Sequence, residues 1–210
     1  IDAPALFEAQ RLAGAQLMQH AAAALPPARK TPGGRRLRIG YVSPNFSRHS
    51  VGYFIEPVLR CHDRTKFEVF CYYTHARADD ATARMRGLAD AWRDVPATDG
   101  DALAAQIRAD GVDILVDLAG HSKANRLAAF AFKPAPLQAT WLGYPDTTGV
   151  PAIDLRITDA VADPAQPQTT ITPTVTMITL FPSLIIQQQV NAVARCVLDG
   201  SPEYRPFLPE

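Results

Sequence analysis

Three short polar segments carry the side chains of this sequence that could do chemistry. They are Ser43–Ser50, Gly120–Lys123 and Gly143–Gly149. Histidine, lysine and hydroxyl side chains bind polar groups, and backbone N–H groups exposed at helix starts suit sugar hydroxyls or phosphate oxygens. None of the segments is a P-loop or a Gly-x-Gly-x-x-Gly fingerprint, and no nucleophile elbow or carboxylate pair is evident. An NAD or ATP site of the usual kind is therefore not indicated.

Each segment also has an ordinary structural interpretation. His49 and Ser50 can cap the helix that follows them, and for a lone histidine this role is as frequent as a functional one. Gly120 can serve only a tight turn, Lys123 can be a solvated helix residue, and Gly143–Gly149 can be a plain turn. The functional interpretation gains weight because all three segments follow predicted strands.

The segments are positioned by alternating strands and helices. Runs of strand-forming residues predict strands over Leu37–Ser43, Phe67–Tyr73, Trp92–Val95, Asp113–Leu118, Leu137–Leu142 and Ile153–Thr158. Apolar periodicity predicts helices over Val51–Leu59, Ala81–Trp92, a segment capped by Thr98 or Asp99 and ended by Gly111, and Ser122–Phe132. Pro57 should bend the first of these helices or shift its start.

This alternation predicts an α/β fold, namely a doubly wound, Rossmann-like parallel sheet of about five to seven strands. The strands are continuously apolar, as expected for a sheet covered on both faces. Asp113–Leu118 should be central. Ligands bind beyond the carboxyl ends of such strands, so His49, His121 and Tyr144 should share one edge.

The two ends of the chain lack the alternating strand and helix pattern of the middle. Residues 3–24 predict an alanine-rich helix that stops at Pro26-Pro27 and packs against the lobe or against upstream helical repeats. We expect residues 1–34 to be a helix and linker, 35–164 the Rossmann-like lobe, and 165–210 a tail. No charged residue lies between Asp163 and Arg195, and no secondary structure is predicted there.

Composition argues against several classes of function. Lys plus Arg number 21 and Asp plus Glu number 21, whereas sites for nucleic acid or anionic membranes normally show a basic excess. The longest apolar stretch, Ile171–Ile186, is too broken by Thr, Ser and Pro to span a membrane. Cys61, Cys71 and Cys196 form no Cys-x-x-Cys pair, so neither a disulfide framework nor a zinc site is expected. No signal peptide is evident. We expect a cytoplasmic protein without nucleic-acid or membrane partners.

Three motifs together resemble the catalytic region of bacterial protein O-GlcNAc transferases and SPINDLY-like proteins. The first is Leu37–Ser43, followed by Asn45-Phe46 and His49. The second is Asp113–His121, with the sequence DILVDLAGH. The third and most specific is Lys133–Pro145, KPAPLQATWLGYP, followed by Thr147-Thr148-Gly149. The resemblance covers roughly residues 3–164.

The resemblance implies the N-terminal lobe of a GT-B glycosyltransferase, in which two Rossmann-like lobes face a cleft and tetratricopeptide helices usually precede them. It implies inverting transfer of N-acetylglucosamine from UDP-N-acetylglucosamine (UDP-GlcNAc), the donor substrate, to a Ser or Thr hydroxyl of a protein or peptide acceptor. No cofactor and no metal are implied. The implied catalytic residue is His49, at the mouth of the active site. Leu142 and Gly143 would line the sugar pocket, and Gly120–Lys123 would border the acceptor groove. The implied substrate-binding residues are Asn45, Val51, Gly120, His121, Lys123, Leu142, Gly143, Tyr144, Pro145 and Thr147.

The sequence departs from this family in three respects. Asn45 stands where animal relatives carry an acidic residue proposed as a base, and an amide cannot take that proton usefully at neutral pH. His121 replaces a tyrosine of those relatives, as in the bacterial and plant-like branch. The second lobe, which in this family holds most nucleotide contacts and the cations that neutralise the leaving diphosphate, is absent, and the tail from Ala165 does not resemble the family. We therefore expect these 210 residues alone not to transfer sugar.

Two other functions stay open at this point. One is O-fucosyl transfer from GDP-fucose, as SPINDLY relatives perform, for which the deciding residues would lie mainly in the second lobe. The other is a non-catalytic peptide-binding module, which Asn45 and the absent lobe favour. A second Rossmann-like lobe in the downstream reading frame would argue against the module.

Overall fold

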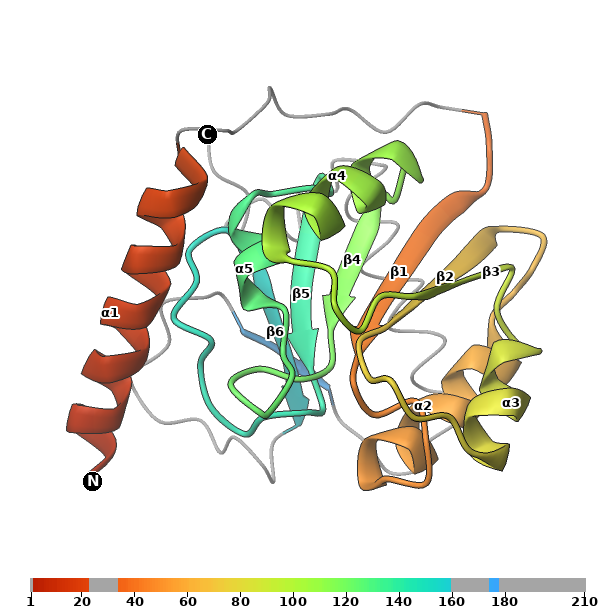
Figure 1. Ribbon diagram of the computed structural model, residues 1–210, viewed down its shortest axis with the longest axis horizontal. Coiled ribbons are helices and arrows are strands. Elements are labelled where there is room, and N and C mark those ends of the chain that lie inside the picture. Colours follow the sequence, from red (N-terminus) through yellow and green to blue (C-terminus); the bar gives the residue numbers. More distant parts are fainter. Residues whose placement is uncertain (1, 23–33, 160–173, 178–210) are drawn as a thin grey trace.

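The structure is a computed structural model that describes residues 2–22, 34–159 and 174–177. Helices and strands alternate along these residues and build a layered α/β unit (Figure 1). The helices are α1 (Ala3–Ala22), α2 (Ser50–Cys61), α3 (Asp80–Arg86), α4 (Gly100–Ala109) and α5 (Leu127–Ala131). The strands are β1 (Leu37–Ser43), β2 (Phe67–Tyr73), β3 (Ala91–Asp94), β4 (Ile114–Asp117), β5 (Leu137–Trp141), β6 (Leu155–Asp159) and β7 (Thr174–Met177).

The strands form one seven-stranded sheet in the order β3-β2-β1-β4-β5-β6-β7, and every neighbouring pair is parallel. The predicted doubly wound, Rossmann-like sheet is confirmed, and β4, with its Ile-Leu-Val run, lies at its centre. The chain adds β2 and β3 on one side of β1 and then crosses to add β4 on the other. Sheets of this type bind ligands beyond the carboxyl ends of the two strands that flank such a reversal.

Alternate residues of the strands pack into two cores, one on each face of the sheet. Ile39 and Tyr41 of β1 join the buried sides of α2 and α3. Val42 faces the other way and joins the buried sides of α4 and α5. Burial of a large apolar side chain stabilises the fold by about 1.5–3 kcal/mol, so both faces are held by packing. This arrangement explains why the strands read as continuous apolar runs.

One predicted helix ends earlier than its apolar stripe. The prediction of a helix over Ala81–Trp92 is wrong beyond α3, because Gly87 caps that helix and its backbone N–H binds carbonyls of the last turn. Trp92 lies in β3, as the overlapping prediction of a strand over Trp92–Val95 indicates. Its ring packs against Phe46 and Tyr73, with ring centroids 5.3 and 5.7 Å away. Tertiary packing of the indole therefore decides the conformation of this segment.

The predicted helix over Ser122–Phe132 is also too long, since only α5 is helical. Ala124 has a φ of 61°, which a right-handed helix excludes. Arg126 donates to the carbonyl of Pro96 at 2.7 Å, and the side-chain oxygen of Asn125 accepts from the backbone N–H of Leu127 at 3.2 Å. These contacts hold the residues before α5 as a loop against the connection between β3 and α4.

One element at each end of the chain, α1 and β7, extends the lobe beyond the predicted residues 35–164. α1 packs beside α5 (Figure 1), and Ala21 near its end is fully buried. β7 pairs with β6 beyond residue 164, in the uncharged stretch for which no secondary structure was predicted; its Thr-Val-Thr sequence is β-branched and suits a strand. α2 runs through Pro57 without ending. The predicted stop at Pro26-Pro27 lies outside the described residues, as does most of the tail. Among the described helices, none has the length and apolar character required to cross a membrane.

Candidate active site

The three polar segments lie along the carboxyl edge of the sheet, where the parallel strands end. Ser43–Ser50 follows β1, Gly120–Lys123 follows β4, and Gly143–Gly149 follows β5. β1 and β4 are the two strands that flank the reversal of strand order. The segments that contain His49, His121 and Tyr144 therefore lie at the edge and near the position that the sequence predicts.

His49 is the residue that caps α2. Its Nδ1 accepts a hydrogen bond from the backbone N–H of Val51 at 3.2 Å, and its backbone is extended. Because a backbone N–H can only donate, Nδ1 is unprotonated and the neutral ring carries its hydrogen on Nε2. The capping role is thus realised. The exposed ring can still donate from Nε2, for which no partner is found among the described residues.

The loop before α2 lies directly on that helix. Gly52 permits this approach, because a Cβ there would lie 2.1 Å from the carbonyl oxygen of Ser47. Asn45 in the loop is half-buried, and its backbone N–H donates to Ser43 Oγ at 3.0 Å. The side chain of Val51 is 5% exposed and packs in the core. Of these two predicted binding residues, only Asn45 has a side chain at the surface.

Asp117, the last residue of β4, holds the turn that follows it. Its carboxylate accepts hydrogen bonds from the backbone N–H groups of Ala119 and Gly120 at 3.1 and 2.8 Å, and from Thr140 Oγ1 at 2.8 Å. Burial raises the pKa of the Asp117 carboxyl above its usual range, and the three hydrogen bonds act in the opposite direction. This buried acceptor ties the end of β4 to β5 and sets the course of the backbone at Gly120.

Two glycines bring the turn after β4 against the turn after β5. Gly120 has a φ of +52°, and a Cβ on it would lie 2.2 Å from the Cβ of Tyr144. A Cβ on Gly143 would lie 1.9 Å from the carbonyl oxygen of Leu118. No side chain fits at either position without displacing its neighbour. Glycine is needed here for close approach of the two turns.

His121 and Tyr144 meet across this contact. Their rings pack edge to face, with centroids 5.4 Å apart. A ring nitrogen of His121, Nε2, lies 2.9 Å from the carbonyl oxygen of Thr148, so in this bond Nε2 donates. Thr147 is buried within the segment after β5, and its Oγ1 accepts a hydrogen bond from the backbone N–H of Gly149 at 3.1 Å. The structure therefore joins the second and third polar segments into one packed assembly.

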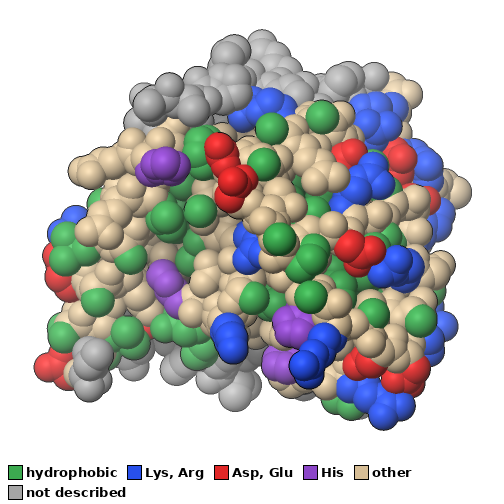
Figure 2. Space-filling model, in the orientation of Figure 1, with side chains coloured by type: hydrophobic (Ala, Val, Ile, Leu, Met, Phe, Trp, Pro, Cys, Tyr) green, Lys and Arg blue, Asp and Glu red, His purple; other side chains and the backbone are tan. Residues whose placement is uncertain are grey.

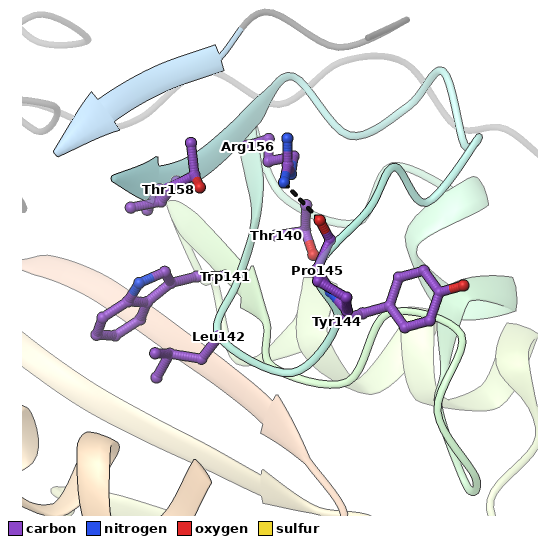
Figure 3. Close-up of a pocket in the computed structure, with 8 residues that line it drawn as sticks. Thr140, Trp141, Leu142, Tyr144, Pro145, Arg156 and Thr158 are labelled. Atoms are coloured by element: carbon purple, nitrogen blue, oxygen red, sulfur yellow. Dashed lines mark hydrogen bonds between the residues drawn. The ribbon is translucent and has the colours of Figure 1, made fainter. Parts of the chain in front are cut away.

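A pocket of about 220 Å³ opens beside this assembly, at the ends of β5 and β6 (Figure 3). Figure 3 shows Trp141 and Leu142 on one side, with the ring of Tyr144 pointing away from them. Leu142 has a φ of 64°, a strained conformation that costs about 1–3 kcal/mol in a residue other than glycine and is concentrated at functional sites. The guanidinium of Arg156 donates to the carbonyl of Pro145 at 2.7 Å and holds the rim.

The cationic side chains of this edge differ in how they are engaged. Arg48 is ion-paired with Asp80 at 2.7 Å, and Arg126 donates to backbone carbonyls. Lys123 is exposed, and no ion pair of it occurs within the described ranges. Histidine and Lys or Arg side chains lie close together near the lower edge of the surface (Figure 2). In the same part of the chain, no group of three or more His, Cys, Asp or Glu residues is arranged to hold a metal ion.

Sequence reasoning missed three residues of this site. Asp117 stands at the carboxyl end of the clearest strand, and that position was a usable signal. Arg156 lies in a strand that is predicted only from its apolar residues. Gln10 of α1 donates to the Tyr144 hydroxyl but lies 134 positions away from Tyr144 in the sequence. No local pattern points to either of these two.

Comparison with known proteins connects this geometry to a family. The model of glycosyl transferase family 41 matches residues 11–180. The SPINDLY protein of Arabidopsis thaliana, a probable UDP-N-acetylglucosamine–peptide N-acetylglucosaminyltransferase, is 47% identical over 134 residues, which are 62% of this chain and 15% of that protein. The UDP-N-acetylglucosamine–peptide N-acetylglucosaminyltransferase of Caenorhabditis elegans is 38% identical over 135 residues, 62% of this chain and 12% of its own length.

A solved structure agrees with these sequence matches. A mutant of the Thermobaculum terrenum O-GlcNAc transferase superposes with a TM-score of 0.68 at 40% identity, covering 80% of this chain and 34% of that one. The present chain spans only 12–15% of the length of the curated relatives above. The family match runs through all three polar segments and on past residue 164 to include β7, so it reaches farther than the resemblance predicted from motifs. The chain belongs to glycosyltransferase family 41.

Proposed function

We propose that this chain is the acceptor-side lobe of a GT-B protein O-GlcNAc transferase. The reaction would be inverting transfer of N-acetylglucosamine from UDP-GlcNAc to a Ser or Thr hydroxyl of a protein. The observation that carries the proposal is the assembly of Gly120, His121 and Tyr144 at the reversal point of the sheet, beside a pocket, in a member of family 41. Relatives whose names state this activity match the same region.

The pocket beside Leu142 is proposed to receive the sugar of the donor. Its volume of about 220 Å³ lies below the range of roughly 300–1,000 Å³ that holds drug-sized ligands. A single sugar ring suits such a space, whereas a whole nucleotide sugar does not. Trp141 and Leu142 offer apolar surface, and Thr158 offers a hydroxyl group. The Thr140 hydroxyl already donates to Asp117 and can only accept a further hydrogen bond. The nucleotide would then be bound mainly by residues outside this lobe.

His49 is proposed to act as a hydrogen-bond donor toward the substrate. Its Nδ1 is occupied by the backbone N–H of Val51, so the neutral ring offers Nε2–H, which can donate to an oxygen of the sugar or acceptor. In this tautomer the ring is not poised to remove a proton through Nε2. Asn45 cannot supply a base either. Removal of the acceptor proton is therefore assigned to another group or to water.

The leaving diphosphate needs cationic or N–H donors. Arg48 and Arg126 already bind Asp80 and backbone carbonyls, and Lys123 belongs to the segment proposed to border the acceptor groove. We propose that donors outside the described residues neutralise the diphosphate. The 210 residues alone would then transfer no sugar.

The test is transfer of radiolabelled sugar to protein acceptors, from UDP-GlcNAc and in parallel from GDP-fucose. The assay compares the 210-residue chain with the protein encoded by the complete reading frame. Transfer from UDP-GlcNAc by the complete product alone supports the proposal. Transfer from GDP-fucose alone assigns the SPINDLY-like fucosyl activity, and acceptor binding without transfer of either sugar assigns a peptide-binding module. Robust transfer by the 210 residues alone contradicts the half-enzyme interpretation.

His49→Ala should lower turnover of the active product by about 10²-fold, the usual effect of losing a positioned polar group in an active site. His75→Ala is the matched control. His75 is also exposed, and its Nδ1 likewise accepts from a backbone N–H two residues on, that of Arg77, at 3.1 Å. It follows β2 rather than β1. Equal losses in the two variants would remove His49 from the site.

We also propose a cytoplasmic location and partners limited to the acceptor protein and the UDP-sugar. Cys61 and Cys71 are both free, as suits a reducing compartment. The balance of 21 basic and 21 acidic residues is not that of a nucleic-acid or membrane binder. Fractionation of the source cells tests the location.

A further inference from the structure

We infer that Gln10 of α1 is a positioning residue for the candidate active site, acting through the hydroxyl of Tyr144. Its consequence in catalysis rests on the proposed function, whereas the coupling itself rests on contacts between α1 and the Tyr144 segment. It assigns to the N-terminal helix a role beyond packing against α5.

The contact is direct, and it is partly buried because Gln10 is buried whereas Tyr144 is half-buried. The amide nitrogen of Gln10 donates to the hydroxyl oxygen of Tyr144 at 3.0 Å, and the Gln10 residue is only 4% exposed. The bond links two positions 134 residues apart. The bond therefore ties the far end of the phenol ring to α1.

A second contact fixes α1 against the same segment. A Cβ on Gly14 would lie 1.7 Å from the carbonyl oxygen of Gly149, and a Cβ on Gly149 would lie 2.1 Å from the carbonyl oxygen of Gln10. The two backbones therefore touch where no side chain fits. One helical turn separates Gln10 from Gly14, so this close approach sets the depth at which Gln10 reaches Tyr144.

The chain of contacts continues to the second polar segment. The Tyr144 ring packs edge to face on His121, and His121 donates to the carbonyl of Thr148, next to the Gly149 backbone on which α1 rests. Gln10 thus holds one side of the Tyr144 ring while His121 occupies another. Displacing the ring by loss of the Gln10 bond displaces the surroundings of His121.

A buried glutamine at position 10 would only lower the stability of the fold if α1 served for packing alone. Its side-chain oxygen, Oε1, is buried with no hydrogen-bond partner among the described residues, and leaving a buried polar atom unpaired costs about 1–3 kcal/mol. Leucine or methionine would fill the space without that cost. The bond to Tyr144 is the feature that an apolar residue would lack.

The experiment follows the imidazole ring of His121 by NMR in the 210-residue chain, which contains five histidines. The His121 signal is assigned with His121→Gln. Gln10→Leu removes the bond from the helix, and Tyr144→Phe removes it from the ring. Gln16→Leu is the matched control, because Gln16 is an exposed glutamine of the same helix.

Both Gln10→Leu and Tyr144→Phe should move the His121 signal in the same direction, and the double variant should move it no further. Gln16→Leu should leave it in place. A His121 signal that stays at its wild-type position in Gln10→Leu overturns the inference, even if the variant melts at a lower temperature. If Gln10→Leu does not fold, an unmoved signal in Tyr144→Phe overturns it equally.

In the product of the complete reading frame, Gln10→Leu should raise the KM for the acceptor by about fivefold, the equivalent of one hydrogen bond. Gln16→Leu should leave this KM unchanged. A moved His121 signal without any sugar transfer by the wild-type product keeps the positioning role and refutes the proposed function. Transfer with a KM unaffected by Gln10→Leu refutes the positioning role in catalysis.

Discussion

Gly120→Ala tests whether the close contact between the turns after β4 and β5 holds the candidate site together. The backbone of Gly120 has a φ of +52°, and an added Cβ would lie 2.2 Å from the Cβ and 2.8 Å from the Cγ of Tyr144. These atoms are at the base of the tyrosine side chain and cannot swing away. The turn, the ring or both must therefore shift.

The magnitude follows from two separate costs. An L-residue in the left-handed region is less stable than glycine by about 1–2 kcal/mol. Forcing a methyl group into a packed site costs about 1–3 kcal/mol more. The variant should thus lose about 2–5 kcal/mol of unfolding free energy, which for a chain of this size lowers Tm by about 4–20 °C.

Gly34→Ala separates the two costs. Gly34 also has a positive φ, +83°, but nothing lies within 4 Å of its added Cβ, so only the backbone cost of about 1–2 kcal/mol applies. Urea unfolding followed by circular dichroism and by tryptophan fluorescence measures both variants. Gly120→Ala should be the less stable by about 1–3 kcal/mol. Equal stability of the two variants would refute the packing argument.

Three further outcomes are expected. Asp117→Asn should lower the unfolding free energy by about 1–3 kcal/mol. The amide cannot accept all the hydrogen bonds that the carboxylate now accepts, and it leaves a buried N–H unpaired. An unchanged urea midpoint would contradict this expectation. Burial lowers the pKa of His62 from 6.5 to about 4. Between these two pH values the unfolded chain binds more protons than the folded chain, so the unfolding free energy falls by up to about 3 kcal/mol as the pH drops from 6.5 to about 4. His62→Gln should flatten that part of the pH profile of stability, and a profile parallel to wild type would show that the ring titrates elsewhere. Sugar transfer by the complete product should survive EDTA, as the proposed metal-independent reaction requires, and loss of activity restored by a divalent cation would contradict it.

The alternation of strands and helices was readable from the sequence because it depends on local periodicity. β1, β2 and β4 are continuous apolar runs, and parallel pairing follows from the helices between them. The three polar segments were readable for the same reason, since each directly follows a strand. Their place at one edge is a consequence of parallel pairing.

The ends of elements were less predictable, because distant contacts decide them. Trp92 continues the apolar stripe of α3 in sequence, yet packing against Phe46 and Tyr73 places it in β3. The loop before α5 is held by bonds to the carbonyl of Pro96 and by the left-handed Ala124. Helical periodicity contains no information on either contact.

The sequence by itself determined the class of the fold, the edge that carries the polar segments and, through its motifs, the resemblance to the family. Only the tertiary structure decided how the site is supported. Asp117 acts as the acceptor beneath the Gly120 turn, and Gln10 reaches Tyr144 from a helix 134 residues away. Hydrogen bonds and backbone contacts of this kind join positions with no shared period and no fixed spacing. They become visible only when the packing of α1 and of the two turns brings the partners within bonding distance.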